Sequence, residues 1–188
     1  MNNNRDVTIN GVDVGKLVTT VDAIKAEPNL SDFKFRAETE WKSGGQSRTT
    51  IQSFYGVGGE DNSRVNPFVI ESDEPPVLLG GNAGPNAVEI VLAGLASCLA
   101  VGFAYNAAVQ GIQMEELNLR LEGDVDLQGF LGLSDAVRPG YKNIRVTCHV
   151  KSDAPQEKLL ALSEYVQRTS PVLDIIRNPV AVSITIET

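Results

Sequence analysis

The sequence feature that most constrains the fold is one long uncharged stretch. Residues 90–109 are twenty consecutive residues without Asp, Glu, Lys or Arg, which is long enough for a helix that crosses a bilayer. No Lys or Arg lies near either end to set an orientation in a membrane, and Gly, Ser, Tyr and Asn interrupt the apolar residues. A helix that is apolar all round is equally typical of the centre of a protein. We therefore expect residues 90–109 to form a long buried helix and not a membrane span.

Alternating patterns before this helix predict antiparallel strands. Over residues 33–42, residues that can be buried alternate with charged ones, which is the period of a half-buried strand. SGGQ then turns the chain, SRTTIQSFY runs back, and NPFVIES predicts a third strand. The Pro- and Gly-rich segment DEPPVLLGGNAGPN leads to the helix, for which Pro85 and Asn86 are suitable starting residues.

The chain after the helix repeats this plan. Alternation over residues 117–127 and 144–151 predicts two strands. We expect Asp153 to cap a second helix, and VAVSITIE predicts a closing strand over residues 180–187. This order of elements predicts an α+β fold, with antiparallel sheets packed around the long central helix.

Composition excludes several classes of partner. The 188 residues carry 16 basic and 24 acidic side chains, and the net charge of −8 repels nucleic acids and anionic lipid surfaces. Two cysteines are too few for a disulfide framework, and the polar start MNNNRDVTIN does not resemble a signal peptide. We expect a cytoplasmic protein without nucleic-acid or membrane partners.

The remaining motifs predict no metal or cofactor site. GVDVGKL has the wrong spacing for a phosphate loop, and the Gly-rich segments GVGGED and GGNAGPN are interpreted as turns. His149 is the single histidine and falls on the polar face of its strand, so it offers neither a zinc ligand set nor a base for a serine nucleophile.

The two cysteines differ in their surroundings. Cys148 shares a strand face with Ile144, Val146 and Val150, which predicts a small core residue. Cys98 lies in GLASCLAVGFAY, and the residues alone leave two interpretations open. It is either a small residue that lets helices pack closely or a reactive thiol.

Two segments resemble one known family. GPNAVEIVLAGLASCLA resembles the helix that carries the reactive cysteine of the OsmC/Ohr family, the osmotically inducible and organic hydroperoxide resistance proteins, whose members read like P-x-E-x-L-x-A-x-x-x-C. RTSPVLDIIRNPVAVSITIE is similar to that family's closing segment, where a Cys-Pro-Val turn opens a short helix before the last strand. We therefore expect an N-terminal extension over residues 1–32 and a single OsmC-like domain over residues 33–188.

The resemblance implies thiol peroxidase chemistry in an intertwined homodimer with two active sites at the subunit interface. It matches Cys98 to the thiol that attacks the peroxide, and Arg48 to an arginine that activates it, with Arg36 as the competing candidate. This chain departs from the family at two positions. Where the family has a carboxylate this chain has a valine, and Glu89 is the next residue. Where the family has its resolving cysteine this chain has Ser170.

A thiol at position 98 needs an activating charge. With the ordinary cysteine pKa of about 8.5, only about 3% of the thiol is ionised at pH 7. A helix that starts near Asn86 places Cys98 about 18 Å from its N-terminus, which is beyond the reach of the helix dipole. A guanidinium in contact with a thiol can lower its pKa by about 1–3, which favours the arginine implied by the resemblance.

Two functions follow from these expectations. The first is a thiol-dependent peroxidase that reduces organic hydroperoxides with an external thiol. Its substrates are apolar because apolar residues surround Cys98, and the candidate substrate-binding residues are Val91, Leu95 and Ser170. The alternative is an OsmC-like fold without peroxidase turnover that acts as a ligand-binding or redox-regulatory protein, which the absence of the second cysteine favours.

Overall fold

A computed structural model describes residues 7–188 of the chain. The described chain divides into two compact units, and each is considered by itself. The first unit comprises Val7 and residues 13–91, and the second comprises residues 8–12 and 92–188.

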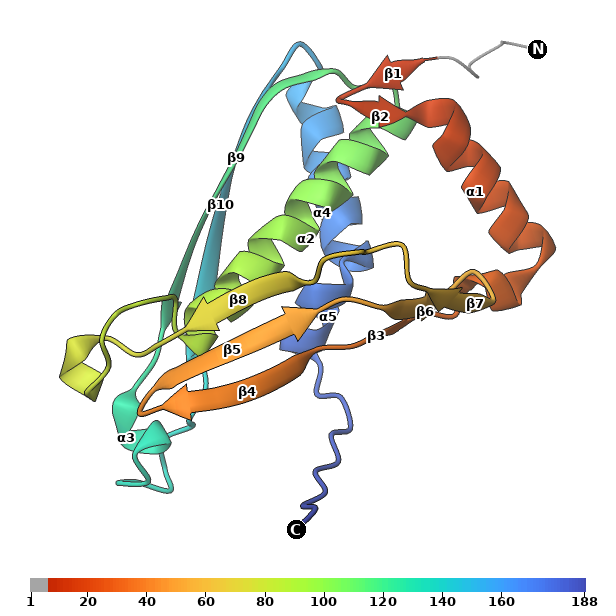
Figure 1. Cartoon of the computed structure of the whole chain (residues 1–188). Helices are drawn as coiled ribbons and strands as arrows, with labels where there is room; N and C mark the ends of the chain where they lie inside the picture. Colours follow the sequence, from red (N-terminus) through yellow and green to blue (C-terminus); the bar gives the residue numbers. More distant parts are fainter. Residues whose placement is uncertain (1–6) are drawn as a thin grey trace. The chain divides into compact units, whose positions relative to one another are not determined.

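The first unit contains two antiparallel sheets of three strands (Figure 1). One sheet has the order β3-β6-β7, formed by Lys34–Phe35, Phe54–Gly56 and Gly59–Asp61. The other has the order β4-β5-β8, formed by Glu38–Ser43, Gln46–Ile51 and Phe68–Ser72. The predicted antiparallel strands and the turn between β4 and β5 are confirmed, but each long predicted strand is broken in two and contributes to both sheets.

The N-terminal residues form a hairpin and a helix that the sequence patterns did not predict. The strands β1 (Thr8–Ile9) and β2 (Val12–Asp13) precede helix α1 (Val14–Ala26) and the short 3₁₀ turn η1 (Pro28–Ser31). Asn10 and Gly11 have positive φ angles of 54° and 75° and make the tight turn. In the second unit, Asn10 Nδ2 donates to the Ile112 carbonyl at 2.9 Å, and the Met114 N–H donates to Asn10 Oδ1 at 2.8 Å.

A buried carboxylate organises the connection that leads to the central helix. Asp73 is 2% exposed and accepts hydrogen bonds from the backbone N–H groups of Ala83, Glu74 and Gly81, and from the Gln46 amide. These bonds, with that of Ala83 the largest contribution, lower the pKa of the Asp73 carboxyl. The connection also contains the 3₁₀ turn η2, Pro76–Leu78.

The central helix α2 spans Ala87–Val109, and Asn86 starts it as expected. Asn86 Oδ1 accepts from the Glu89 N–H at 3.0 Å, and Glu89 Oε2 accepts from the Asn86 N–H at 2.9 Å. This reciprocal pair is a capping box, which satisfies two backbone donors at the helix start.

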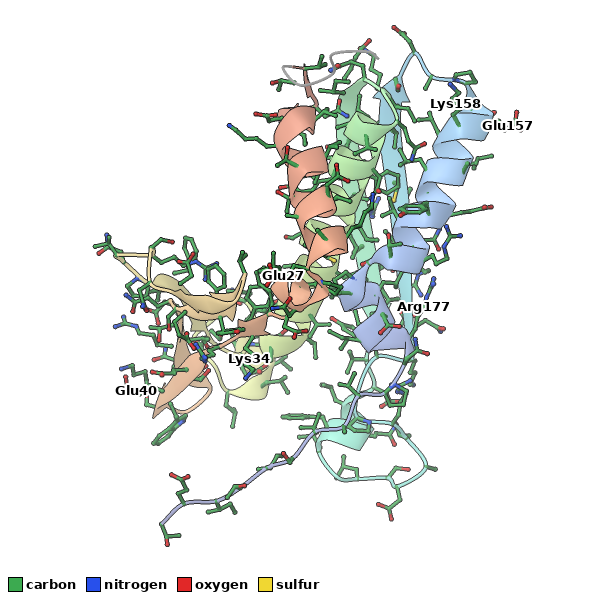
Figure 2. All side chains as sticks on the ribbon, turned by 90° about the vertical axis from the view of Figure 1, so that its right-hand side faces the viewer. Glu27, Lys34, Glu40, Glu157, Lys158 and Arg177 are labelled. Atoms are coloured by element: carbon green, nitrogen blue, oxygen red, sulfur yellow. The ribbon has the colours of Figure 1, made fainter. Side chains whose placement is uncertain are left out.

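The second unit packs helices against a two-stranded sheet. Strands β9 (Met114–Asp124) and β10 (Asn143–Ser152) pair antiparallel, and the short helix α3 (Leu127–Phe130) lies in the loop between them. Helices α4 (Gln156–Thr169) and α5 (Pro171–Arg177) follow, and Figure 2 labels Glu157 near the start of α4 and Arg177 at the end of α5. The buried core of this unit consists of Leu95, Leu99, Phe103, Ala107, Ile112, Leu162, Val166 and Leu173.

Three expectations for the second unit are wrong. Asp153 does not cap α4, because the residue before the helix is Pro155 and no side chain caps it. Cys148 is exposed, because the core covers Ile144 and Val150 on its face of β10 but not the positions between them. Residues 180–187 form no strand, because no strand within residues 7–188 pairs with them.

Helix α2 contributes one of its faces to the core of the second unit. Its length and a mean hydropathy of 2.1 meet the requirements for a membrane span, but one face contributes Leu95, Leu99 and Phe103 to the core. The opposite face is exposed and includes Val101 and Tyr105. Within the second unit, α2 therefore has one buried and one exposed face, and the expectation of a helix buried all round is not confirmed.

Candidate functional site

Cys98 and Ser170 lie side by side in the second unit. Cys98 is on α2, and Ser170 is the single residue between α4 and α5. The distance between Cys98 Sγ and Ser170 Oγ is 3.2 Å, within hydrogen-bond distance for sulfur. Ser170, which the resemblance matches to the resolving cysteine, is thus in direct contact with Cys98, the candidate reactive thiol.

The hydrogen bonds of Ser170 give this contact a direction. Ser170 Oγ caps α5 by accepting a hydrogen bond from the Leu173 N–H at 3.3 Å. A serine hydroxyl has one proton to donate, and this proton is not used in the cap. Cys98 in its thiolate form can only accept, so Ser170 is then the donor of the contact. Ser170 is 6% exposed, which keeps this donor largely away from water.

A groove of about 470 Å³ opens beside this pair. Its lining residues come from α2, from the end of α4 and from the start of α5, and they are Ser97, Cys98, Val101, Gly102, Tyr105, Asn106, Val166, Thr169, Ser170 and Pro171. None of these side chains is charged, and the middle of the groove is apolar. Such a site suits an apolar or neutral molecule that reaches the sulfur of Cys98.

Gly102 allows α2 and α4 to approach closely beneath the groove. A Cβ atom at position 102 would lie 2.8 Å from Val166 Cγ1, which is closer than side chains pack. A glycine is therefore required here for the close contact of the two helices.

Arg48, the candidate activating residue, is held within its own sheet. Its guanidinium contacts Glu71 at 2.6 Å, on the neighbouring strand β8. The hydrogen bond with Glu71 raises the pKa of Arg48 further above its usual value, so this side chain stays cationic. The competing candidate Arg36 forms a two-point ion pair with Glu60.

The other predicted site residues lie at different places along α2. Glu89 belongs to the capping box at the start of the helix. Val91 is 42% exposed and does not line the groove, and Leu95 is buried in the core. Of the six predicted residues, the structure brings together Cys98 and Ser170 in one site.

Cys148 differs from Cys98 in its environment. It is exposed on β10, and partial burial by its neighbours raises the pKa of its thiol. A raised pKa leaves less thiolate near neutral pH, which makes Cys148 less reactive than an unperturbed cysteine.

Sequence reasoning missed the far end of the groove. Gly102, Tyr105 and Asn106 follow Cys98 by four, seven and eight residues, and the helical repeat could have found them. The side of the groove formed by Val166 and Thr169 depends on the packing of α4 against α2, which no local pattern contains.

Comparison with known proteins identifies the fold. Residues 80–185 match the OsmC family, described as OsmC-like protein. The crystal structure of an OsmC-like protein from Mycoplasma pneumoniae aligns with a TM-score of 0.60 at 14% identity, over 78% of this chain and 89% of that chain. An organic hydroperoxide resistance protein OsmC from Legionella pneumophila aligns with a TM-score of 0.53 at 18% identity, over 77% of this chain and 89% of that chain.

A third structure is an organic hydroperoxide resistance protein from Vibrio cholerae with captopril in one of its active sites. It aligns with a TM-score of 0.53 at 11% identity, over 80% of this chain and 90% of that chain. A search of curated proteins gives no match. Identities this low show the fold and leave the activity of this chain open. Because the family match covers more than half of the sequence, and because these structures share its α+β fold with antiparallel sheets, this chain belongs to the OsmC-like protein family.

Proposed function

We propose that this protein is a thiol-dependent peroxidase in which Cys98 reduces organic hydroperoxides and an external thiol restores the enzyme. The observation that carries this proposal is the contact between Cys98 and Ser170 at the end of an uncharged groove. The named function of the Legionella and Vibrio proteins, organic hydroperoxide resistance, agrees with it. We expect the protein to act in the cytoplasm.

The proposed reaction uses a thiolate and a peroxide bond. The Cys98 sulfur attacks the terminal oxygen of the hydroperoxide, the O–O bond breaks, and the alkoxide leaves and takes up a proton to become an alcohol. Sulfur gives two electrons to the peroxide and becomes a sulfenic acid. Ser170 donates its hydroxyl proton in a hydrogen bond to the thiolate before attack and stays beside the sulfenic acid afterwards.

The return to the thiol requires a partner outside the chain. Serine forms no disulfide, and the other cysteine, Cys148, lies on β10 and is not among the residues that line the groove beside Cys98. An external thiol attacks the sulfenic sulfur, water leaves, and a mixed disulfide forms. A second thiol then releases Cys98 as a thiol and leaves as the external disulfide.

Arg48 remains our proposed activator, as the resemblance implies. Its ion pair with Glu71 provides a carboxylate that positions the guanidinium. Glu89, one place on from the family's carboxylate position, is used in the capping box, so we assign the positioning of Arg48 to Glu71.

We further propose that the functional form is a homodimer. The exposed face of α2 and the C-terminal segment both carry apolar side chains that a second copy would cover. In that segment Val182, Ile184 and Ile186 are 78%, 88% and 84% exposed, and they alternate as in a strand. Pairing with a second copy would bury them, and light scattering should give about twice the chain mass of 20.2 kDa. A mass near 20.2 kDa at micromolar concentration would refute the dimer.

Peroxide consumption by the purified protein tests the activity. We expect turnover of cumene hydroperoxide in the presence of dithiothreitol, faster than turnover of hydrogen peroxide. Cys98→Ser should abolish it, and the matched variant Cys148→Ser should retain it. If no hydroperoxide is consumed although Cys98 is free and accessible to alkylation, the protein is instead the ligand-binding or regulatory alternative, which the serine at position 170 favours.

A further inference from the structure

The groove beside Cys98 has polar side chains at both ends, with Ser97, Thr169 and Ser170 near the thiol, and apolar ones between them. Val101, Gly102 and Val166 form the middle, and Tyr105 and Asn106 line the end away from the thiol. A groove for purely apolar substrates would not need two hydrogen-bonding side chains at this end.

The polar atoms at the far end are available for a ligand. Asn106 Nδ2 donates to the Gly102 carbonyl at 2.7 Å, which fixes the amide and leaves Oδ1 as an acceptor. Within residues 7–188, the Tyr105 hydroxyl has no hydrogen-bond partner, and the ring is 48% exposed at the edge of the groove. A ligand at this end of the groove therefore meets one acceptor, Asn106 Oδ1, and one group that can donate or accept, the Tyr105 hydroxyl.

The separation of this end from the thiol follows from helix geometry. Tyr105 lies seven residues after Cys98, which is nearly two full turns, so both side chains project from the same face of α2. The rise along the helix between them is about 10 Å. A linear molecule of medium length therefore reaches from the Cys98 sulfur to the Tyr105 hydroxyl.

The charge of the site excludes one class of end group. No cationic side chain of the second unit lines the groove, the proposed activator Arg48 would act at the thiol end, and the chain carries a net charge of −8. The nearest guanidinium in sequence to Thr169 belongs to Arg168, which lies over the ring of Tyr165 and is not a lining residue. A carboxylate at the far end would meet no counter-ion among these lining residues, whereas a neutral end group needs none.

We infer that the site selects neutral hydroperoxides whose far end carries a hydroxyl or amide group, bound by Tyr105 and Asn106, over hydroperoxides that end in a methyl group or a carboxylate. This inference rests on the proposed peroxidase function only in naming the ligand's reactive group as a hydroperoxide. Helices α2 and α4 supply the walls of the groove described here, and the second copy proposed above would close its open side.

Protection of Cys98 from alkylation tests the preference without turnover. The probes are octanol, octanediol and hydroxyoctanoate, which correspond to the alcohols left after reduction of hydroperoxides with the three end groups. We expect octanediol to slow the reaction of iodoacetamide with Cys98 at a two- to tenfold lower concentration than octanol, as one or two neutral hydrogen bonds allow. Hydroxyoctanoate should protect least.

Two tyrosine variants provide the matched comparison. Tyr105→Phe removes only the hydroxyl and should make octanediol and octanol nearly equal in their protection. Tyr165→Phe makes the same change on α4 outside the groove and should leave the preference for octanediol intact. The inference is overturned if octanediol protects no better than octanol, if hydroxyoctanoate protects best, or if Tyr105→Phe keeps the preference. Peroxide consumption measured separately shows whether the proposed function fails, so the two failures are distinguishable.

Discussion

Replacing Ser170 by cysteine should turn the Cys98 site into one that forms a disulfide. The two side-chain atoms that face each other are 3.2 Å apart, close enough for a sulfur at position 170 to react with a sulfenic acid on Cys98. The two positions are 72 residues apart in sequence, and closing a loop of this size stabilises the oxidised protein by about 4 kcal/mol relative to the reduced one. For a chain of this length the melting temperature should then rise by about 8–16 °C on oxidation.

The assay compares oxidised and reduced Ser170→Cys in a Cys148→Ser background. One equivalent of cumene hydroperoxide should remove both thiols, give no dimedone adduct, and raise the melting temperature, with reversal by dithiothreitol. Ser163→Cys, two turns earlier on α4, is the control and should form no disulfide because it lies about 10 Å from position 170 along the helix. The reasoning is refuted if Ser170→Cys keeps both thiols after oxidation, or if Ser163→Cys behaves in the same way.

Three further predictions concern charge and packing. Arg48→Met should move the pH midpoint of Cys98 alkylation upward by more than about one unit, and no change would remove Arg48 from the activating role. Gly102→Ala should cost about 1–2 kcal/mol in urea unfolding because its Cβ meets Val166, while Gly94→Ala on the same helix, with no atom nearby, should not destabilise. Asp73 has its pKa lowered by folding, so it stabilises the protein above the ordinary carboxyl pKa, and this contribution is lost as the pH falls through the folded value. Asp73→Asn should therefore be less stable at pH 7 and lose less stability on acidification, and an unchanged acid limb of the denaturation profile would contradict this account.

The central helix could be predicted because local signals mark it. The uncharged run defines its length, and Asn86 with Glu89 three residues later is a capping pair that the structure contains. The N-terminal hairpin could not be predicted in this way. Its strands have two residues each, and Asn10 is held by Ile112, more than a hundred residues away.

Two of the three errors in the second unit, those at Cys148 and at residues 180–187, have a common physical cause. Alternation correctly identifies which face of a strand is apolar, but it does not say whether this chain covers that face. Cys148 and the segment at residues 180–187 both follow an apolar alternation and are both exposed. A dimer would reconcile the pattern with the exposure, because the cover would then come from another copy.

The site was only partly accessible from sequence. The family resemblance matches Cys98 and Ser170 to site positions. Their contact depends on the packing of α4 antiparallel to α2, through Gly102 and Val166. Arg48 was matched in the same way, but its carboxylate partner Glu71 comes from strand pairing between β5 and β8. Strand register across a sheet is not contained in any short motif.

Trapping of the oxidised cysteine tests the central claim most directly. The native protein is treated with one equivalent of cumene hydroperoxide, dimedone is added, and the adducts are mapped by mass spectrometry. We predict a dimedone adduct on Cys98, none on Cys148, and no disulfide within the chain. An unmodified Cys98, or a disulfide between Cys98 and Cys148 as the main product, would contradict the account.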